Sequence, residues 1–180
     1  MDERELVERA KKDKKYFEKL YEIYFDKIYS YIYYRTFNHL ITEDLTSETF
    51  MKVLRSLDRF EWKANGSFSA WIFRIAQNVV NDYYRSKKEF VDIEKISDSS
   101  WLKNPEDELL DKIEKDEIKN ALKRLTKDQQ EVVILRYGAN MKFNEIAKIK
   151  NKSDVAVRAL FFRAMHSLKE MLLKEVHESE

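Results

Sequence analysis

The stretch FSAWIFRIAQNVVNDYYRSKK, residues 68–88, carries side chains that can bind nucleic acids. Placed on a helix at about 100° per residue, its polar residues fall on one side, which has three cations and no acid, with Asp82 at the edge. Arg, Asn and Gln have bidentate geometry for the edges of bases, and Tyr stacks on unpaired bases. This polar side consists of Arg74, Gln77, Asn78, Asn81, Tyr84, Arg85 and Lys88.

The opposite side of the same stretch predicts a buried surface. An arc broad enough to pack against other helices contains Phe68, Ile72, Ile75, Ala76, Val79, Val80 and Tyr83. Trp71 lies on the boundary between the two sides, close to the turn signal Asn65-Gly66. A solvated polar face without a ligand is the alternative interpretation, but the absence of acids favours nucleic-acid binding.

A second candidate for DNA binding lies near the C-terminal end. FNEIAKI predicts a short helix, and KNK predicts a tight turn in which Asn151 adopts a left-handed conformation. Ser153 is the expected cap of a last helix. Two helices joined by a tight turn and followed by basic residues fit a helix-turn-helix, although a small helical bundle without DNA contacts gives a similar pattern.

The sequence gives little support for catalysis. The histidines His39, His166 and His177 are scattered, and none is spaced to pair with a carboxylate or a nucleophile. There is no glycine-rich phosphate loop and no cluster of metal ligands. Acidic pairs such as Glu43-Asp44 are interpreted as the starts of helices. We therefore expect no enzyme, no catalytic residues, no metal and no cofactor.

The composition predicts an all-α protein. Two glycines and one proline in 180 residues leave little turn chemistry for sheets and little to interrupt helices. The absence of cysteine excludes disulfides and thiolate metal sites. No apolar run approaches the roughly 20 residues that span a membrane, and MDERELVERAKK lacks the apolar core of a signal peptide. We expect a soluble, cytoplasmic protein with no membrane partner.

The charges divide the chain into three parts. Residues 1–88 carry 17 Lys and Arg against 14 Asp and Glu, residues 89–112 carry 3 against 8, and residues 113–180 carry 14 against 11. The acidic middle part also holds the only proline, which is typical of a linker between two domains. An acidic surface loop within one domain is the alternative.

Several helix boundaries follow from capping residues. Thr42 is the expected cap of one helix, with Glu43 and Asp44 in its first turn, where the helix dipole favours acids. Asn104 and Pro105 predict the start of a helix in the second half. TKDQ, beginning at Thr126, is a capping box for the helix after it, which Gly138 is expected to end.

Two segments of the chain together resemble a known family. EDLTSETFMKVLRSLDRF with FSAWIFRIAQNVVNDYYRSKK resembles region 2 of the extracytoplasmic-function (ECF) group of sigma-70 family RNA polymerase sigma factors. LTKDQQEVVILRYGANMKFNEIAKIKNKSDVAVRALFFRA resembles region 4 of the same group. The resemblance extends from Tyr16 to Leu172, with both motifs in the family's order.

The resemblance implies a promoter-specificity subunit that docks on core RNA polymerase, recognises two promoter elements and helps to open the downstream one. Residues 1–88 would form region 2 and residues 113–180 region 4, two small helical domains joined by a flexible acidic linker, residues 89–112. Implied partners are promoter DNA, the clamp helices of the largest polymerase subunit, the flap of the second subunit and an anti-sigma factor. No small-molecule substrate is implied.

The family pattern assigns roles to individual residues of region 2. Asn65, Ser67 and Trp71 lie where the family captures an unstacked base, at an unpairing cost of about a few kcal/mol that stacking and edge hydrogen bonds offset. The DNA-binding set continues with Arg74, Gln77, Asn78, Asn81, Arg85, Lys87 and Lys88, and Asp82 at its rim is expected to orient its neighbours. The polymerase-docking set is Asp44, Leu45, Glu48, Phe50 and Lys52.

Region 4 departs further from the family pattern than region 2 does. In region 4, Thr126 stands where the family usually has proline, and Val155-Ala156 stands where it usually has Gly-Thr. In region 2, Ser47 stands where the family usually has glutamine, which is a milder change. The predicted DNA-binding set is Lys150, Lys152, Ser153, Asp154, Val155, Arg158, Ala159, Phe162 and Arg163. Its cations would reach phosphates, and Val155 or Ala159 would contact thymine methyl groups.

Two alternatives remain open on the sequence. In the first alternative, Phe162 and its neighbours face a protein partner instead of DNA. In the second alternative, the whole chain is a helix-turn-helix regulator whose N-terminal half is a protein-interaction module.

Overall fold

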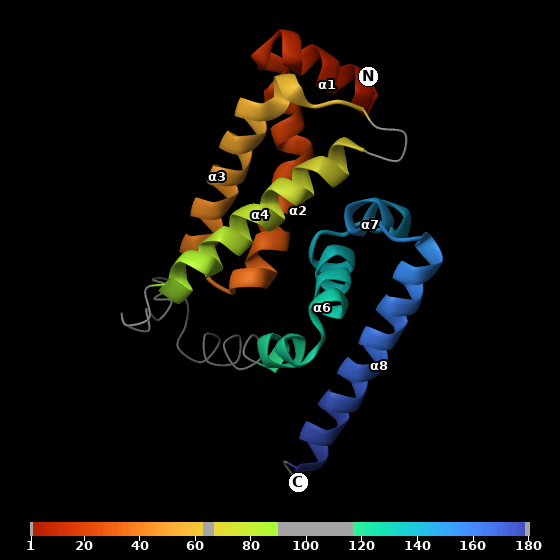
Figure 1. Ribbon diagram of the computed structural model, residues 1–180. Helices are drawn as coiled ribbons and strands as arrows, with labels where there is room; N and C mark the ends of the chain where they lie inside the picture. Colours follow the sequence, from red (N-terminus) through yellow and green to blue (C-terminus); the bar gives the residue numbers. More distant parts are fainter. Residues whose placement is uncertain (1, 63–66, 90–116, 179–180) are drawn as a thin grey trace.

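The computed structural model describes residues 2–62, 67–89 and 117–178. Every regular element in these ranges is helical, which confirms the all-α prediction. Two helical domains lie on either side of residues 90–116 in the chain (Figure 1). The predicted linker and the predicted helix start at Asn104-Pro105 fall largely or wholly outside the described residues, as does Asn65.

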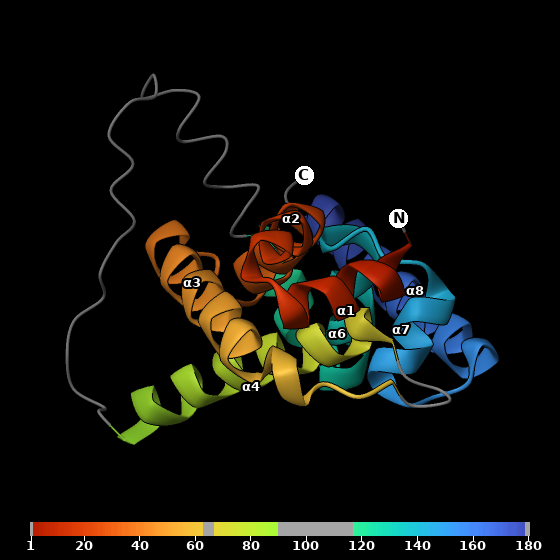
Figure 2. The same ribbon diagram turned by 90° about the horizontal axis from the view of Figure 1, so that it is seen from above.

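The first domain is a bundle of long helices around an aromatic core. α2, α3 and α4 pack against one another, and α1 crosses their end (Figures 1 and 2). Buried residues from different helices, such as Ile28, Tyr31, Val53 and Phe68, form the core. The elements are α1 (Glu3–Lys12), η1 (Lys14–Tyr16), α2 (Phe17–Thr36), α3 (His39–Ser56), η2 (Leu57–Arg59) and α4 (Phe68–Glu89).

α3 begins one turn earlier than the sequence indicated. Asn38 is its N-cap, because the Asn38 side-chain oxygen accepts a hydrogen bond from the backbone N–H of Ile41 at 2.9 Å. Thr42 is buried, and its hydroxyl donates to the Asn38 carbonyl at 2.7 Å. The prediction that Thr42 caps the helix, with Glu43 and Asp44 in the first turn, is therefore wrong. Phe37 ends α2 in the left-handed conformation (φ 51°), which lets α3 start directly after it.

The second domain contains the shorter helices and one long one. Residues 117–124 are helical, followed by α6 (Lys127–Val133), the π-helical segment η3 (Ile134–Gly138), α7 (Phe143–Lys150) and α8 (Asp154–Glu178). The Thr126 capping box is confirmed, with the side chain of Gln129 bonded back to the backbone of Thr126. Gly138 ends the helical segment that began at Lys127, as predicted.

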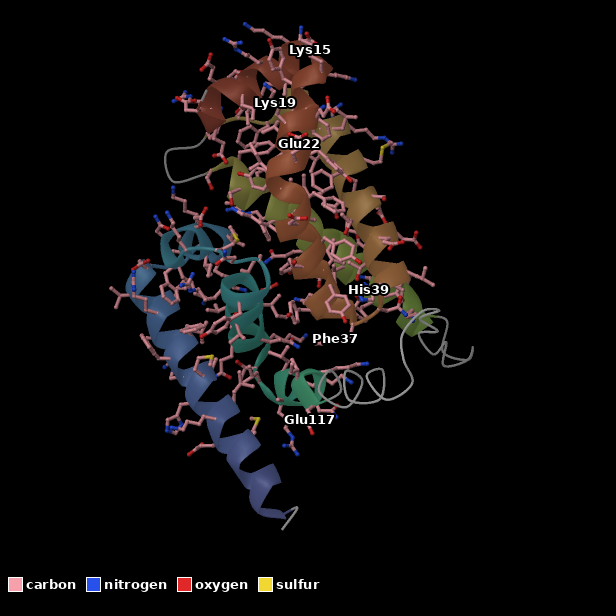
Figure 3. The ribbon with its side chains drawn as sticks, turned by 180° about the vertical axis from the view of Figure 1, so that it is seen from behind. Lys15, Lys19, Glu22, Phe37, His39 and Glu117 are labelled. Carbon is pink, nitrogen blue, oxygen red and sulfur yellow. The ribbon has the colours of Figure 1, made fainter. Side chains whose placement is uncertain are left out.

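The two domains contact each other directly. η3 packs on α2, and α7 packs on α4. A Cβ atom on Gly138 would lie only 2.7 Å from Cδ2 of Tyr34, so any larger residue here would force the Tyr34 ring or the backbone to shift. At the end of α2, the Phe37 ring lies near the helix that contains Glu117, and the Lys119 ammonium stands 5.9 Å from the ring centroid (Figure 3).

Candidate nucleic-acid interface

α4 presents one buried side and one polar side. Ser67 begins the helix, because its hydroxyl accepts a hydrogen bond from the Ala70 backbone N–H at 3.1 Å. Phe68, Ile72 and Val80 are fully buried, as predicted, and Phe73 joins them. Residues of the predicted DNA-binding set that are exposed on α4 are Arg74, Asn78, Asn81, Arg85 and Lys87, while the side chain of Lys88 lies outside the described part.

Trp71 occupies the boundary that the sequence predicts for it. The side chain is half-buried, and its ring centroid lies 4.9 Å from that of Phe60 and 5.4 Å from that of Phe68. These aromatic contacts hold the indole near the start of α4. A fixed, partly open aromatic surface is suited to stacking against a base.

Hydrogen bonds from α2 position the far part of the α4 face. Arg35 donates from Nη2 to Oδ1 of Asn81 at 3.3 Å, and the Tyr84 hydroxyl donates to the Arg35 carbonyl at 2.5 Å. Asp82 forms an exposed ion pair with Arg85 at 3.3 Å. An exposed pair adds little stability, and the orienting role of Asp82 stays a prediction.

Gln77 faces the second domain. Its Nε2 donates at 3.1 Å to Oε1 of Glu131 on α6. The same oxygen accepts hydrogen bonds from the Tyr31 hydroxyl at 3.0 Å and from Nη1 of Arg35 at 3.1 Å. Lys150 donates to the other oxygen, Oε2. Glu131 therefore sits at the centre of a polar cluster that joins both domains.

The amino-acid sequence does not predict this cluster. Arg35 and Glu131 are 96 positions apart in the chain, and neither belongs to a recognisable motif. One signal was present: Glu131 follows the capping box on the side of α6 that also carries Asp128, close to the expected helix-turn-helix. Only the packing of the two domains brings these residues together.

Burial and charge perturb the titration of several groups here. Burial raises the pKa of the Tyr31 hydroxyl, and the Glu131 carboxylate raises it further. Burial disfavours the charged form of Lys150, but hydrogen bonds and attraction to Glu131 and Asp128 raise the pKa of Lys150 overall. The hydrogen bond from Lys150 lowers the pKa of Asp128. Lys150 therefore remains a cation held between two acids.

α7 and α8 form the expected helix-turn-helix. Asn151 has φ 51° and ψ 45°, the predicted left-handed conformation, and ends α7. Ser153 caps α8 by accepting a hydrogen bond from the Ala156 backbone N–H at 3.1 Å. Val157, Phe161 and Ala164 are buried against the rest of the domain. The opposite side of the α8 start is exposed.

The cations of the second domain are largely engaged within the protein. The side chain of Lys150 is 13% exposed and is held in ion pairs with Asp128 and Glu131, so in this arrangement its charge is already offset. Lys152 lies 3.4 Å from Asp128, and Arg158 pairs with Asp154 at 2.6 Å while covering the Phe143 ring. The other predicted members, Val155, Ala159, Phe162 and Arg163, are exposed, with Val155 at 76% and Phe162 at 64%.

The predicted polymerase-docking residues on α3 divide into two groups. Leu45 and Phe50 are 5% exposed and belong to the core, so they support the helix and do not form a surface. Asp44 and Glu48 are exposed, and Glu48 pairs with Lys52 at 2.8 Å. The same helix also exposes two apolar residues outside the predicted docking set, Leu40 at 65% and Met51 at 47%.

Within the described residues, no group of three or more His, Cys, Asp or Glu side chains is arranged to hold a metal ion. None of the described helices is both long and apolar enough to cross a membrane.

A helical bundle with an acid-poor polar face and a separate helix-turn-helix define a two-domain DNA-binding protein. Family models agree: Sigma-70 region 2 matches residues 20–90, and Sigma-70, region 4 matches residues 115–168. The chain belongs to the ECF group of the sigma-70 family of RNA polymerase sigma factors.

Curated relatives carry the same family name. The chain is 35% identical over 172 residues to the ECF RNA polymerase sigma factor BldN of Streptomyces coelicolor, covering 93% of this chain and 65% of the length of BldN. It is 28% identical to the ECF RNA polymerase sigma factor SigX of Bacillus subtilis, covering 91% of this chain and 89% of SigX.

Solved structures share the fold. The structure of CnrH in complex with the cytosolic domain of CnrY matches with a TM-score of 0.71 at 22% identity, covering 94% of this chain and 96% of that chain. The sigma factor RpoE of Bartonella quintana, solved with the anti-sigma factor NepR, matches with a TM-score of 0.62 at 23% identity, covering 87% and 96%.

Proposed function

We propose that this sigma-70 family protein directs promoter-specific initiation by core RNA polymerase. The first domain binds the downstream promoter element as it opens, and the helix-turn-helix binds the upstream element. The observation that carries the proposal is the acid-poor row Arg74, Asn78, Asn81 and Arg85, exposed along one side of α4. Cations that reach phosphates and amides that read base edges supply affinity and specificity, respectively.

Trp71 marks one end of this DNA path. An aromatic ring held by Phe60 and Phe68 gives an unpaired base a surface on which to stack. Asn65 and Ser67 complete the proposed base pocket by family resemblance. The polymerisation chemistry belongs to the polymerase, and the chain itself is not an enzyme.

The polymerase-docking surface lies on α3. Its polar contacts come from Asp44, Glu48 and Lys52, and Leu40 and Met51 supply the exposed apolar area. Two further partners follow from the family: the flap of the second polymerase subunit, and an anti-sigma factor of the kind named in the solved complexes. A cytoplasmic location follows from the same role.

A reconstituted transcription assay tests the proposal. The chain is mixed with core RNA polymerase on a promoter identified by sequencing the transcripts that its overexpression induces. We expect promoter-dependent transcripts only with core enzyme present, and weak binding of duplex DNA by the chain alone. Tight duplex binding by the chain alone, without promoter-dependent transcripts, would instead establish a helix-turn-helix regulator.

A further inference from the structure

Three side chains of the first domain converge on one carboxylate of the second. Tyr31 and Arg35 extend from α2 and Gln77 extends from α4, and all three donate to Oε1 of Glu131 at 3.0 to 3.1 Å. The ion pair between Arg35 and Glu131 is shielded from solvent, because the two side chains are only 18% and 14% exposed. These three donors form an anion site on the first domain.

The anion site is continuous with the proposed promoter surface. The second guanidinium nitrogen of Arg35 donates to Asn81, and Gln77 lies one turn of α4 from both Asn81 and Arg74. Arg74 itself donates to the Lys148 carbonyl of α7 at 3.4 Å. In this arrangement the second domain therefore uses polar groups of the same face that would bind DNA.

Glu131 and Arg35 differ in whether each would keep an oppositely charged partner if the two domains separated. Glu131 also pairs with Lys150 of its own domain, so it keeps a cation when the domains separate. Among the described residues, Glu131 is the acid with which Arg35 pairs. Separation would leave the Arg35 guanidinium exposed and in need of another anion. A guanidinium fork binds a carboxylate and a phosphate with the same geometry.

We infer that Glu131 is an intramolecular substitute for a backbone phosphate of the promoter strand. When the two domains are in contact, which we call the closed form, the Glu131 carboxylate fills the anion site of Tyr31, Arg35 and Gln77. A phosphate takes its place when the domains separate. The inference rests on the proposed function for the identity of the nucleic acid. It also gives the close approach of Gly138 to Tyr34 a role, since this approach lets α6 and η3 reach α2.

The fraction of molecules whose two domains are in contact sets how much the apparent affinity for DNA should rise when the domains separate. The apparent dissociation constant of a protein equals its intrinsic value divided by the fraction that is competent to bind. If about one molecule in ten is open, complete opening raises the apparent affinity for DNA about tenfold.

Distances between two spin labels test the closing role. The chain has no cysteine, so Arg55→Cys on α3 and Lys169→Cys on α8 place one label on the exposed surface of each domain. We expect Glu131→Gln, which keeps the shape and removes the charge, to shift the distribution to longer distances. Gly138→Ala should give the same shift through steric conflict with Tyr34, while retaining the charge. The matched control Glu170→Gln, exposed on α8, should not change the distances.

DNA binding tests the phosphate site. On a promoter fork with an unpaired strand, Glu131→Gln and Gly138→Ala should each bind about tenfold more tightly than the unaltered chain. Adding Arg35→Ala to Glu131→Gln should remove part of this gain and reduce the slope of log affinity against log salt by about one, the signature of one lost phosphate contact.

The outcomes separate this inference from the proposed function. Unchanged distances in both Glu131→Gln and Gly138→Ala would overturn the closing role, and an unchanged salt slope after Arg35→Ala would overturn the phosphate site. Neither measurement includes RNA polymerase. Failure of the proposed function would appear separately, as the absence of promoter-dependent transcripts with core enzyme.

Discussion

The two helices that we propose to bind DNA, α4 and α8, differ in the side chains that their exposed faces offer. On α4, Arg74, Asn78 and Asn81 are exposed along a face without acids. At the start of α8 the arginine nearest the turn, Arg158, is paired with Asp154, and Lys152 of the preceding turn is paired with Asp128. The exposed residues that remain include the apolar Val155 and Phe162.

The difference indicates two modes of recognition. A face of Arg and Asn side chains binds by hydrogen bonds and charge, which suits a strand that is being unpaired. A face with Val, Ala and Phe binds by apolar contact, which suits the thymine methyl groups in an intact major groove or a protein surface. Position in a motif does not distinguish these modes, because they depend on which side chains each helix exposes.

The largest effect is expected on the α4 face. Arg74→Ala or Asn78→Ala should reduce open-complex formation by roughly 5- to 150-fold, as expected for the loss of a contact worth about 1–3 kcal/mol. Binding to core RNA polymerase should change much less. The measurements are permanganate reactivity of unpaired thymines and co-purification with core enzyme, with Lys169→Ala as the control. Equal losses in both measurements would contradict the assignment of these residues to DNA.

A smaller effect is expected from the apolar residues of α8. Val155→Ser should weaken upstream-element binding by about fivefold, or about 1 kcal/mol, and the loss should disappear when the contacted thymine is replaced by uracil, which lacks the methyl group. The measurement is transcription from matched promoters. A loss that is equal on both templates, together with weaker binding of a protein partner, would favour the protein-facing interpretation of this surface.

The paired cation Lys152 should matter less than the exposed Arg163. Arg163→Ala is expected to weaken DNA binding by a few-fold and to reduce the salt slope by about one. Lys152→Ala is expected to change affinity less than about twofold, because its ion pair with Asp128 already offsets its charge. Salt titrations of holoenzyme binding compare the two variants. A larger loss for Lys152→Ala would show that the pair opens on DNA.

The smallest effect concerns acid stability. Because Lys150 lowers the pKa of Asp128, the ionised carboxylate is favoured in the folded state. Its contribution is present above the ordinary Asp pKa of about 4 and is lost as the pH falls through the lowered pKa. The difference in urea midpoint between the unaltered chain and Asp128→Asn should therefore narrow between pH 6 and pH 3. A constant difference would mean that the charge of Asp128 contributes nothing.

Local signals predicted several helix ends of the second domain and its helix-turn-helix well. The Thr126 capping box, the left-handed Asn151 and the Ser153 cap are short-range features, and each appears in the structure as expected. The failure at Thr42 is also local in origin. Both Asn38 and Thr42 are acceptable caps, and the choice of Asn38 depends on how Phe37 ends α2.

The sequence by itself determined the helical class, the polar face of α4 and the helix-turn-helix, because helix periodicity and capping involve residues only a few positions apart. Tertiary structure alone decided which of those side chains are available. Leu45 and Phe50 are buried, Lys150 is held between two acids, and Gln77 and Arg35 bind Glu131. Ion pairs and burial depend on distances between residues far apart in the chain, and those distances are set by how the two domains pack.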